Sequence, residues 1–80
     1  KPATFYLDVI STLKNNFQFP TFAYQVSGEY GMLKSACEKG WLSEPQVVLE
    51  SLVSIKRAGA DGIFTYYALQ AARWLKEKAL

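Results

Sequence analysis

Eighty residues are enough for one small domain at most, and 50% of them are hydrophobic and 15% aromatic. A domain of this size buries only about 60 to 65% of the surface of its unfolded chain, which leaves little interior for so many large side chains. The composition therefore indicates part of a larger core. Nine cationic and seven anionic side chains are spread along the sequence, which excludes the basic stripe of a nucleic-acid-binding protein.

The sequence has no histidine and a single cysteine, Cys37. The commonest general base and the commonest zinc ligand are therefore absent, and one cysteine supplies neither an internal disulfide nor a metal-binding pair. Any chemistry must rest on Lys, Tyr, Ser, Asp or Glu. Neither an apolar run of about 18 residues nor a signal peptide occurs, so we expect a chain that does not enter a membrane.

The first half predicts a helix, a strand and a second helix. Apolar residues recurring every three to four positions predict a helix over 5–17 with one buried face. A β-branched and aromatic run predicts a short buried strand over 21–26. Gly28 is expected to turn the chain into a helix over 30–38, which Gly40 closes in a left-handed conformation. The predicted buried face of the first helix consists of Tyr6, Val9, Ile10, Leu13 and Phe17.

The second half predicts a long helix, a strand and a last helix. Ser43 and Gln46 have the spacing of a capping box, which predicts a helix start, and Gly59 is placed to end that helix. A second strand is expected over 62–67 and a final helix over 68–78. The apolar face of the long helix is predicted to be Val48, Leu49, Leu52 and Ile55.

Strands separated by helical crossovers must run parallel, so the predicted class is α/β. Two strands are too few for a stable parallel sheet, because both edges would lack partners. The simplest interpretation is the C-terminal portion of a (β/α)8 TIM barrel, whose full length is about 250 residues. We therefore expect residues 1–80 to be the C-terminal fragment of one catalytic domain that does not fold alone.

Three polar residues lie at or near the predicted carboxyl ends of strands, where the active sites of such barrels are built. These residues are Lys1, Ser27 and Tyr66, and we expect them to face one mouth of the barrel. Each has an ordinary alternative. A lysine at a chain start is usually solvated, a Ser-Gly pair usually caps a helix, and only one of Tyr66 and Tyr67 can point into the barrel from a strand.

Four segments closely resemble the C-terminal part of the 5-aminolevulinate dehydratase family, also called porphobilinogen synthases. They are Lys-Pro-Ala at 1–3, Tyr-Gln-Val-Ser-Gly-Glu-Tyr at 24–30, Lys-Arg-Ala-Gly-Ala-Asp at 56–61 and Thr-Tyr-Tyr at 65–67. The resemblance runs to about Trp74 and implies a (β/α)8 barrel, of which this chain covers the stretch from just after the sixth strand through the eighth helix.

The resemblance also implies roles for four residues. Lys1 matches the lysine that forms a Schiff base with one substrate molecule, Ser27 and Tyr66 match the residues that hold the carboxylate of that substrate, and Tyr24 matches a tyrosine near the Schiff base. A free lysine has a pKa of about 10.4. A second ammonium and a partly desolvated pocket would lower that value, and the family's second lysine would lie upstream.

The implied activity is the condensation of two 5-aminolevulinate molecules to porphobilinogen in tetrapyrrole and heme biosynthesis. The resemblance further implies zinc or magnesium bound by upstream residues, none held in this segment, and a homo-oligomer, which is an octamer in the family. It implies a cytoplasmic enzyme, or a plastid one where a transit peptide precedes it. No nucleic-acid or membrane partner is expected, and the 80 residues alone should be inactive.

Two alternatives stay open at this point. One is another Schiff-base barrel enzyme of the class I aldolase type, and the other is a noncatalytic helical interaction domain. Three acidic residues are given structural roles: Glu29 in a first helical turn, where it complements the helix dipole, Glu50 on a polar helix face, and Asp61 at a helix-to-strand connection.

Overall fold

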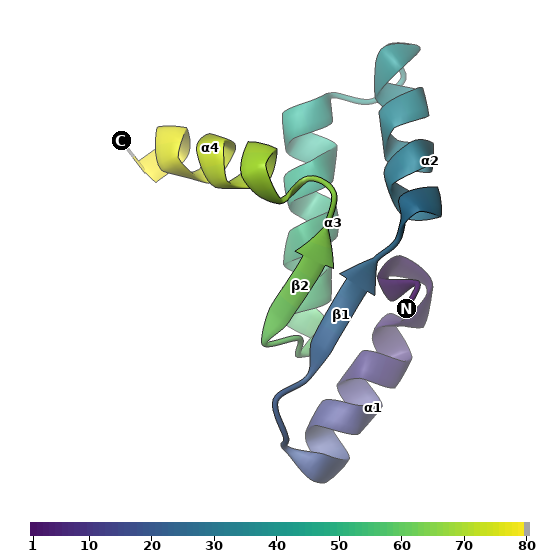
Figure 1. The fold of residues 1–80 in the computed structure, drawn as a ribbon, viewed down its shortest axis with the longest axis vertical. Coiled ribbons are helices and arrows are strands. Elements are labelled where there is room, and N and C mark those ends of the chain that lie inside the picture. Colours follow the sequence, from purple (N-terminus) through teal and green to yellow (C-terminus); the bar gives the residue numbers. More distant parts are fainter. Residues whose placement is uncertain (80) are drawn as a thin grey trace.

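The computed structural model describes residues 1–79 and contains a two-stranded parallel sheet with helices before, between and after the strands (Figure 1). Phe22 pairs with Gly62 and Gln25 with Thr65, so the strands are in register over their whole length. The predicted order of helices and strands is confirmed. The elements are a 3-10 helix η1 (Ala3–Tyr6), α1 (Leu7–Phe17), β1 (Phe22–Gln25), α2 (Ser27–Glu38), α3 (Glu44–Ala58), β2 (Gly62–Thr65) and α4 (Ala68–Ala79).

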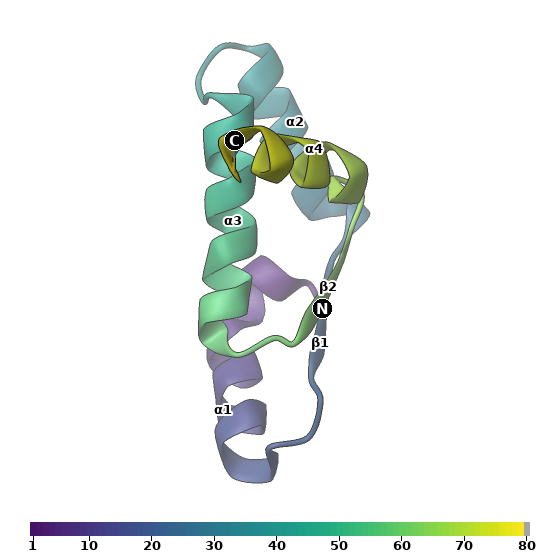
Figure 2. The same cartoon turned by 90° about the vertical axis from the view of Figure 1, so that its left-hand side faces the viewer.

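Helices α1 and α3 cover one face of the sheet, which Figure 2 shows edge-on. Side chains alternate between the two faces of a strand, and Ala23 and Gln25 of β1 are buried toward the helices. Phe22 and Phe64 lie side by side on the other face, with ring centroids 5.9 Å apart, and both are about 60% exposed. The core between sheet and helices consists of Ala3, Ile10, Ala23, Ile55 and Ala60.

Glycines end two helices, as predicted. Gly40 has φ +78°, and its N–H and that of Trp41 bond back to the last turn of α2, the pattern of a Schellman motif. Gly59 has φ +123° at the end of α3, and an added Cβ there would lie 3.1 Å from the Lys14 side chain. Larger residues at Gly59 would therefore suffer both backbone strain and a close contact.

The predicted starts of α2 and α3 need correction. α2 begins at Ser27 rather than beyond a turn at Gly28, because Glu29 reaches back and accepts the Val26 N–H at 2.7 Å. Ser43 is the N-cap of α3, but its side chain makes no capping hydrogen bond. A capping hydroxyl accepts from the second or third helical N–H, and Pro45, at the second position, has none.

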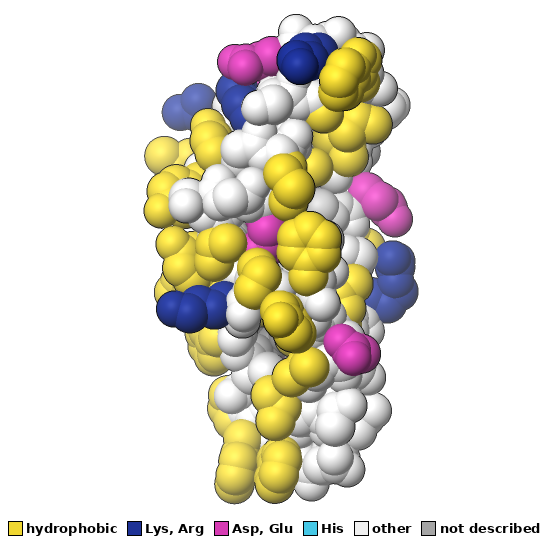
Figure 3. Space-filling model, turned by 90° about the vertical axis from the view of Figure 1, so that its right-hand side faces the viewer, with side chains coloured by type: hydrophobic (Ala, Val, Ile, Leu, Met, Phe, Trp, Pro, Cys, Tyr) yellow, Lys and Arg dark blue, Asp and Glu magenta, His cyan; other side chains and the backbone are white. Residues whose placement is uncertain are grey.

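The predicted buried face of the first helix is also wrong for this structure. The helix opens as a 3-10 turn, and of the five residues only Ile10 is buried. The other four are 43 to 60% exposed because no described part of the chain covers them. Figure 3 shows hydrophobic side chains in a nearly continuous column on the face of the molecule that lies to the right in Figure 1. None of the described helices is both long and apolar enough to span a bilayer.

Candidate active site

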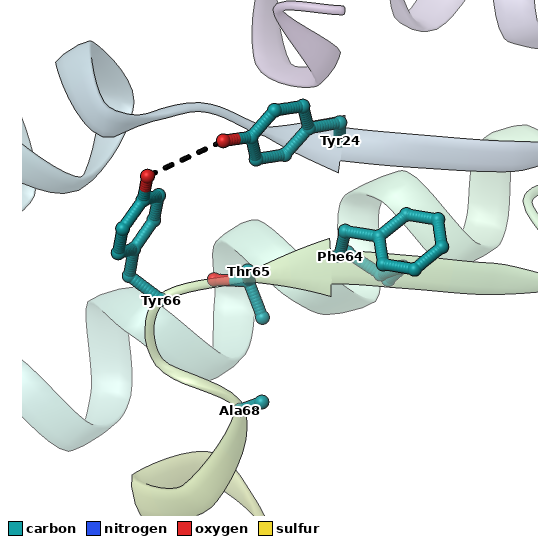
Figure 4. Close-up of a pocket in the computed structure, with 6 residues that line it drawn as sticks. Tyr24, Phe64, Thr65, Tyr66 and Ala68 are labelled. Atoms are coloured by element: carbon teal, nitrogen blue, oxygen red, sulfur yellow. Dashed lines mark hydrogen bonds between the residues drawn. The ribbon is translucent and has the colours of Figure 1, made fainter.

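The carboxyl ends of β1 and β2 carry three of the four residues predicted for the site, and the fourth, Lys1, lies at the start of the chain before η1. Ser27 is exposed and is separated from the end of β1 by one residue, Val26, and Tyr66 directly follows β2. The hydroxyls of Tyr24 and Tyr66 lie 3.3 Å apart across the strand ends (Figure 4). The hydrogen bond with Tyr66, together with partial burial, raises the pKa of Tyr24. The Tyr24 phenol therefore stays neutral at physiological pH. Tyr24 and Tyr66 line one hollow with Phe64 and Ala68.

Tyr66 is exposed and Tyr67 is buried, although not for the predicted reason. β2 ends at Thr65, so the two tyrosines lie in a turn rather than on a strand. The Thr65 hydroxyl accepts the Tyr67 N–H at 3.1 Å and fixes that turn. Tyr67 is fully buried, whereas Tyr66 is 58% exposed and faces the hollow.

A stack of aromatic rings supports this turn from the side of α2. The Tyr30 ring lies 5.6 Å from that of Tyr66 and 4.7 Å from that of Tyr67, centroid to centroid. The Trp74 ring of α4 packs on the other side of Tyr67 at 6.3 Å. Such tilted pairs stabilise by about 0.5 to 1.5 kcal/mol beyond their buried area. Tyr30 therefore helps to hold the Tyr66 ring in place beside the hollow that it lines.

Gln25 joins the ends of the two strands beneath the site. Its side chain is fully buried, its Oε1 accepts from the Thr65 hydroxyl at 2.7 Å, and its Nε2 donates to the Ser51 hydroxyl at 3.1 Å. Ser51 in turn donates to the Val48 carbonyl. The sequence reasoning missed this residue. The sequence does contain a signal for Gln25, which is a lone amide in an otherwise apolar and aromatic strand. A buried amide must find hydrogen-bond partners, so such a residue is expected to join neighbouring elements.

Glu29 holds the chain that follows Lys1 against the end of β1. Its side chain is 2% exposed, and its two oxygens accept the N–H groups of Thr4 and Val26, each at 2.7 Å. Figures 1 and 2 accordingly place the amino terminus beside β1. The bond from the Thr4 N–H to Glu29 thus holds the segment that follows Lys1 against the first turn of α2, the helix that begins at Ser27. The prediction that Glu29 lies in a first helical turn is confirmed, but its bond to Thr4 was not foreseen.

A second partly buried carboxylate, Glu44, connects α3 with α2 and with the turn after β2. Its Oε2 accepts from Lys34 Nζ at 2.9 Å and from the Tyr67 hydroxyl at 3.1 Å. The Lys34 ammonium, helped by the Tyr67 hydroxyl, lowers the pKa of Glu44, while burial followed by the bond to Glu44 raises the pKa of Tyr67.

This arrangement predicts an acid-sensitive contribution to stability. Because folding lowers the pKa of Glu44, its contribution is fully present above the ordinary glutamate pKa of about 4.3 and is lost as the pH falls through the folded-state value. Glu44→Gln should lower the urea midpoint at pH 6 and flatten its decline between pH 5 and pH 3. An unchanged decline would show that Glu44 does not titrate in this way.

Asp61 has the structural role expected of it, at the opposite ends of the strands. Its carboxylate pairs with Lys14 at 2.6 Å and accepts the Thr21 N–H at 2.8 Å, and these bonds lower its pKa. Among the described residues, no group of three or more His, Cys, Asp or Glu side chains lies close enough to hold a metal ion.

Parallel strands joined through helices are the repeating unit of the (β/α)8 barrel, and the active sites of barrel enzymes lie at the carboxyl ends of these strands. A family model described as "Delta-aminolevulinic acid dehydratase" matches residues 1–74, and the chain belongs to this family. Within it, the chain corresponds to the C-terminal part of the barrel, as predicted.

Individual relatives agree with the family model. The chain is 53% identical over 77 residues to the delta-aminolevulinic acid dehydratase of Bacillus subtilis, which covers 96% of this chain and 24% of that protein. It is 60% identical over 75 residues to the chloroplastic enzyme of Physcomitrium patens, covering 94% of this chain and 17% of that protein. The chain thus spans about a quarter or less of the length of these relatives.

A crystal structure gives the same fold. The delta-aminolevulinic acid dehydratase of Toxoplasma gondii, in complex with the reaction product porphobilinogen, matches 92% of this chain and 21% of its own length with a TM-score of 0.91 and 54% identity. This agreement confirms the predicted α/β class and barrel origin. It also favours the dehydratase family over the class I aldolase and the noncatalytic interaction domain.

Proposed function

We propose that residues 1–80 form the C-terminal part of a single catalytic barrel domain that condenses two molecules of 5-aminolevulinate to porphobilinogen with loss of water. The observation that carries this proposal is the pair of hydroxyls of Tyr24 and Tyr66 at the carboxyl ends of adjacent parallel strands. Ser27 lies just after β1, and the Thr4 N–H, three positions after Lys1, is bound to Glu29 in the first turn of the same helix. The family assignment and the product-bound relative support it.

In this function Lys1 is the nucleophile. Its neutral amine adds to the ketone carbon of one 5-aminolevulinate, and loss of water from the resulting carbinolamine leaves an iminium on Nζ. The amine must be unprotonated to attack, so the complete site must lower its pKa from about 10.4. A second lysine contributed by another part of the barrel would do this by charge repulsion.

Ser27 and Tyr66 bind the carboxylate of the same substrate molecule. Both hydroxyls can donate, and neither carries a charge that would compensate the iminium on Lys1. Tyr24 holds the Tyr66 hydroxyl toward the mouth of the hollow through the bond between their oxygens and packs beside the iminium. Fixing one substrate in this way orients it for bond formation with the second, which is the main catalytic contribution of such contacts.

The partners and cofactors of the whole enzyme belong to the same proposal. Its metal, zinc or magnesium, would be held by other parts of the barrel, because the described residues offer no suitable group of ligands. The enzyme would be a homo-oligomer. Two of the relatives are named as chloroplastic and others are bacterial, so either a plastid or a cytoplasmic location is consistent with the family.

The carboxylate contacts test this function. In the complete enzyme, Ser27→Ala and Tyr66→Phe should each raise KM for 5-aminolevulinate about 10-fold or more, since a hydrogen bond to a charged group contributes about 1.5 to 3 kcal/mol. Both variants should still form the covalent adduct at Lys1. Porphobilinogen formation measured against substrate concentration gives the KM values.

The matched control is Ser35→Ala, which removes an exposed hydroxyl from α2 away from the strand ends. It should leave KM unchanged. Normal KM values in both Ser27→Ala and Tyr66→Phe would show that these residues do not hold the substrate carboxylate.

A further inference from the structure

Glu29 is a buried carboxylate whose two partners are backbone N–H groups from different segments. Its Oε1 accepts from Thr4, 25 positions earlier in the chain, and its Oε2 accepts from Val26, three positions earlier. A helix start requires only the second of these bonds, in which the third helical residue reaches back to the N-cap. The bond to Thr4 therefore has another consequence, which is to fasten η1 to the end of β1.

The two bonded residues stand next to two proposed site residues. Val26 immediately precedes Ser27, and Thr4 follows Lys1 by three positions. Three residues extend at most about 11 Å, so anchoring the Thr4 N–H limits where the Lys1 backbone can lie. The Glu29 side chain thus limits where the backbones of both Lys1 and Ser27 can lie.

The chemistry of the contact requires a carboxylate. Burying a charge is costly unless it is well hydrogen-bonded, and here each oxygen has its own short charge-assisted bond. A glutamine has one accepting oxygen and would turn its NH2 group toward the other N–H. Glu29→Gln therefore keeps the size and shape of the side chain but must break one of the two bonds.

We infer that Glu29 is a positioning residue for the Schiff-base chemistry: by binding both backbone segments, it holds Lys1 at the distance from Ser27 that lets the amine meet the ketone of a bound substrate. The inference rests on the proposed function, because it takes Lys1 as the nucleophile. Glu29 itself does not touch the substrate in this scheme. Its effect is on geometry, and small displacements of a reacting group can reduce rates by about 100-fold.

The test compares Glu29→Gln with Asp61→Asn in the complete enzyme. Asp61 is a matched control, because its carboxylate also accepts a backbone N–H and joins a helix to the sheet, but at the opposite ends of the strands. Each variant is incubated with 5-aminolevulinate and borohydride, and the rate of reductive labelling at Lys1 is measured by peptide mass mapping. Steady-state kinetics and thermal unfolding are recorded in parallel.

We expect Glu29→Gln to slow labelling at Lys1 and to lower kcat by about 10- to 100-fold, with a smaller change in KM. Asp61→Asn should lower thermal stability without changing the labelling rate. Labelling of Glu29→Gln at the unsubstituted rate would overturn the inference while leaving the proposed function intact. Absence of labelling at Lys1 in the unsubstituted enzyme would instead overturn the proposed nucleophile, and the inference with it.

A second measurement does not depend on the folding of a variant. In the unsubstituted complete enzyme the Thr4 N–H should exchange slowly with deuterium, because the structure gives it the buried Glu29 carboxylate as partner. Fast exchange at Thr4 beside a protected Val26 would show that Glu29 only caps α2, and that result would also overturn the inference.

Discussion

Lys1→Ala in the complete enzyme should abolish the covalent adduct with 5-aminolevulinate and nearly all turnover. Borohydride reduces an imine to a stable secondary amine, so the unsubstituted enzyme should carry the substrate on the peptide that contains Lys1. Loss of the amine removes the covalent intermediate itself. Mass mapping of the peptide after reduction and an assay of porphobilinogen formation measure the two effects separately.

Lys1→Arg should be almost as inactive. A guanidinium keeps the positive charge but remains protonated and cannot attack a ketone. The control is Lys39→Ala, which removes a lysine at the far end of α2, where its ammonium lies over the Trp41 ring, and which should leave both measurements unchanged. An active Lys1→Arg enzyme would show that Lys1 acts through its charge and not as the nucleophile.

Residues 1–80 expressed alone should not form a cooperatively folded monomer. Within the described residues 1–79, neither edge of the sheet has a neighbouring strand, and one face of the sheet carries exposed aromatic rings. Unpaired strands and large apolar patches favour association. Urea titration followed by circular dichroism should give a broad transition, size-exclusion chromatography should show oligomers, and a dye that binds apolar surface should fluoresce strongly.

The exposed apolar residues are distributed over most of the described elements, so no single helix could cover them. They occur in η1 and α1, on the strands, and in α2, α3 and α4. A sharp, reversible transition of a monomer would contradict both this prediction and the proposal that the chain is part of a larger barrel domain. The large hydrophobic side chains that are more than 40% exposed are Phe5, Tyr6, Val9, Leu13, Phe17, Phe19, Phe22, Met32, Trp41, Leu42, Val53, Phe64, Tyr66, Leu69 and Leu75.

Local patterns in the sequence were sufficient for the order of the elements and for several of their ends. The spacing of apolar residues identified α3 and its buried face, because that face packs on described parts of this chain. The same pattern identified α1 as a helix but did not predict which of its residues are buried. Burial depends on the surface that packs against the helix, and the described residues do not provide that surface. Gly40 and Gly59 marked helix ends because only a residue without Cβ adopts those backbone angles easily.

The sequence by itself thus determined the α/β order and, through the resemblance of its motifs, the residues to test. The tertiary structure decided how those residues are held. The bonds from Glu29 to Thr4 and from Thr65 to Gln25 join positions 25 and 40 residues apart, and no helical or strand periodicity reports contacts at such separations. The burial of Tyr67 beside the exposure of Tyr66 follows partly from a local turn closed by the Thr65 hydroxyl. It also follows from the packing of Tyr67 on the Tyr30 ring, a contact that exists only once α2 lies beside the turn after β2.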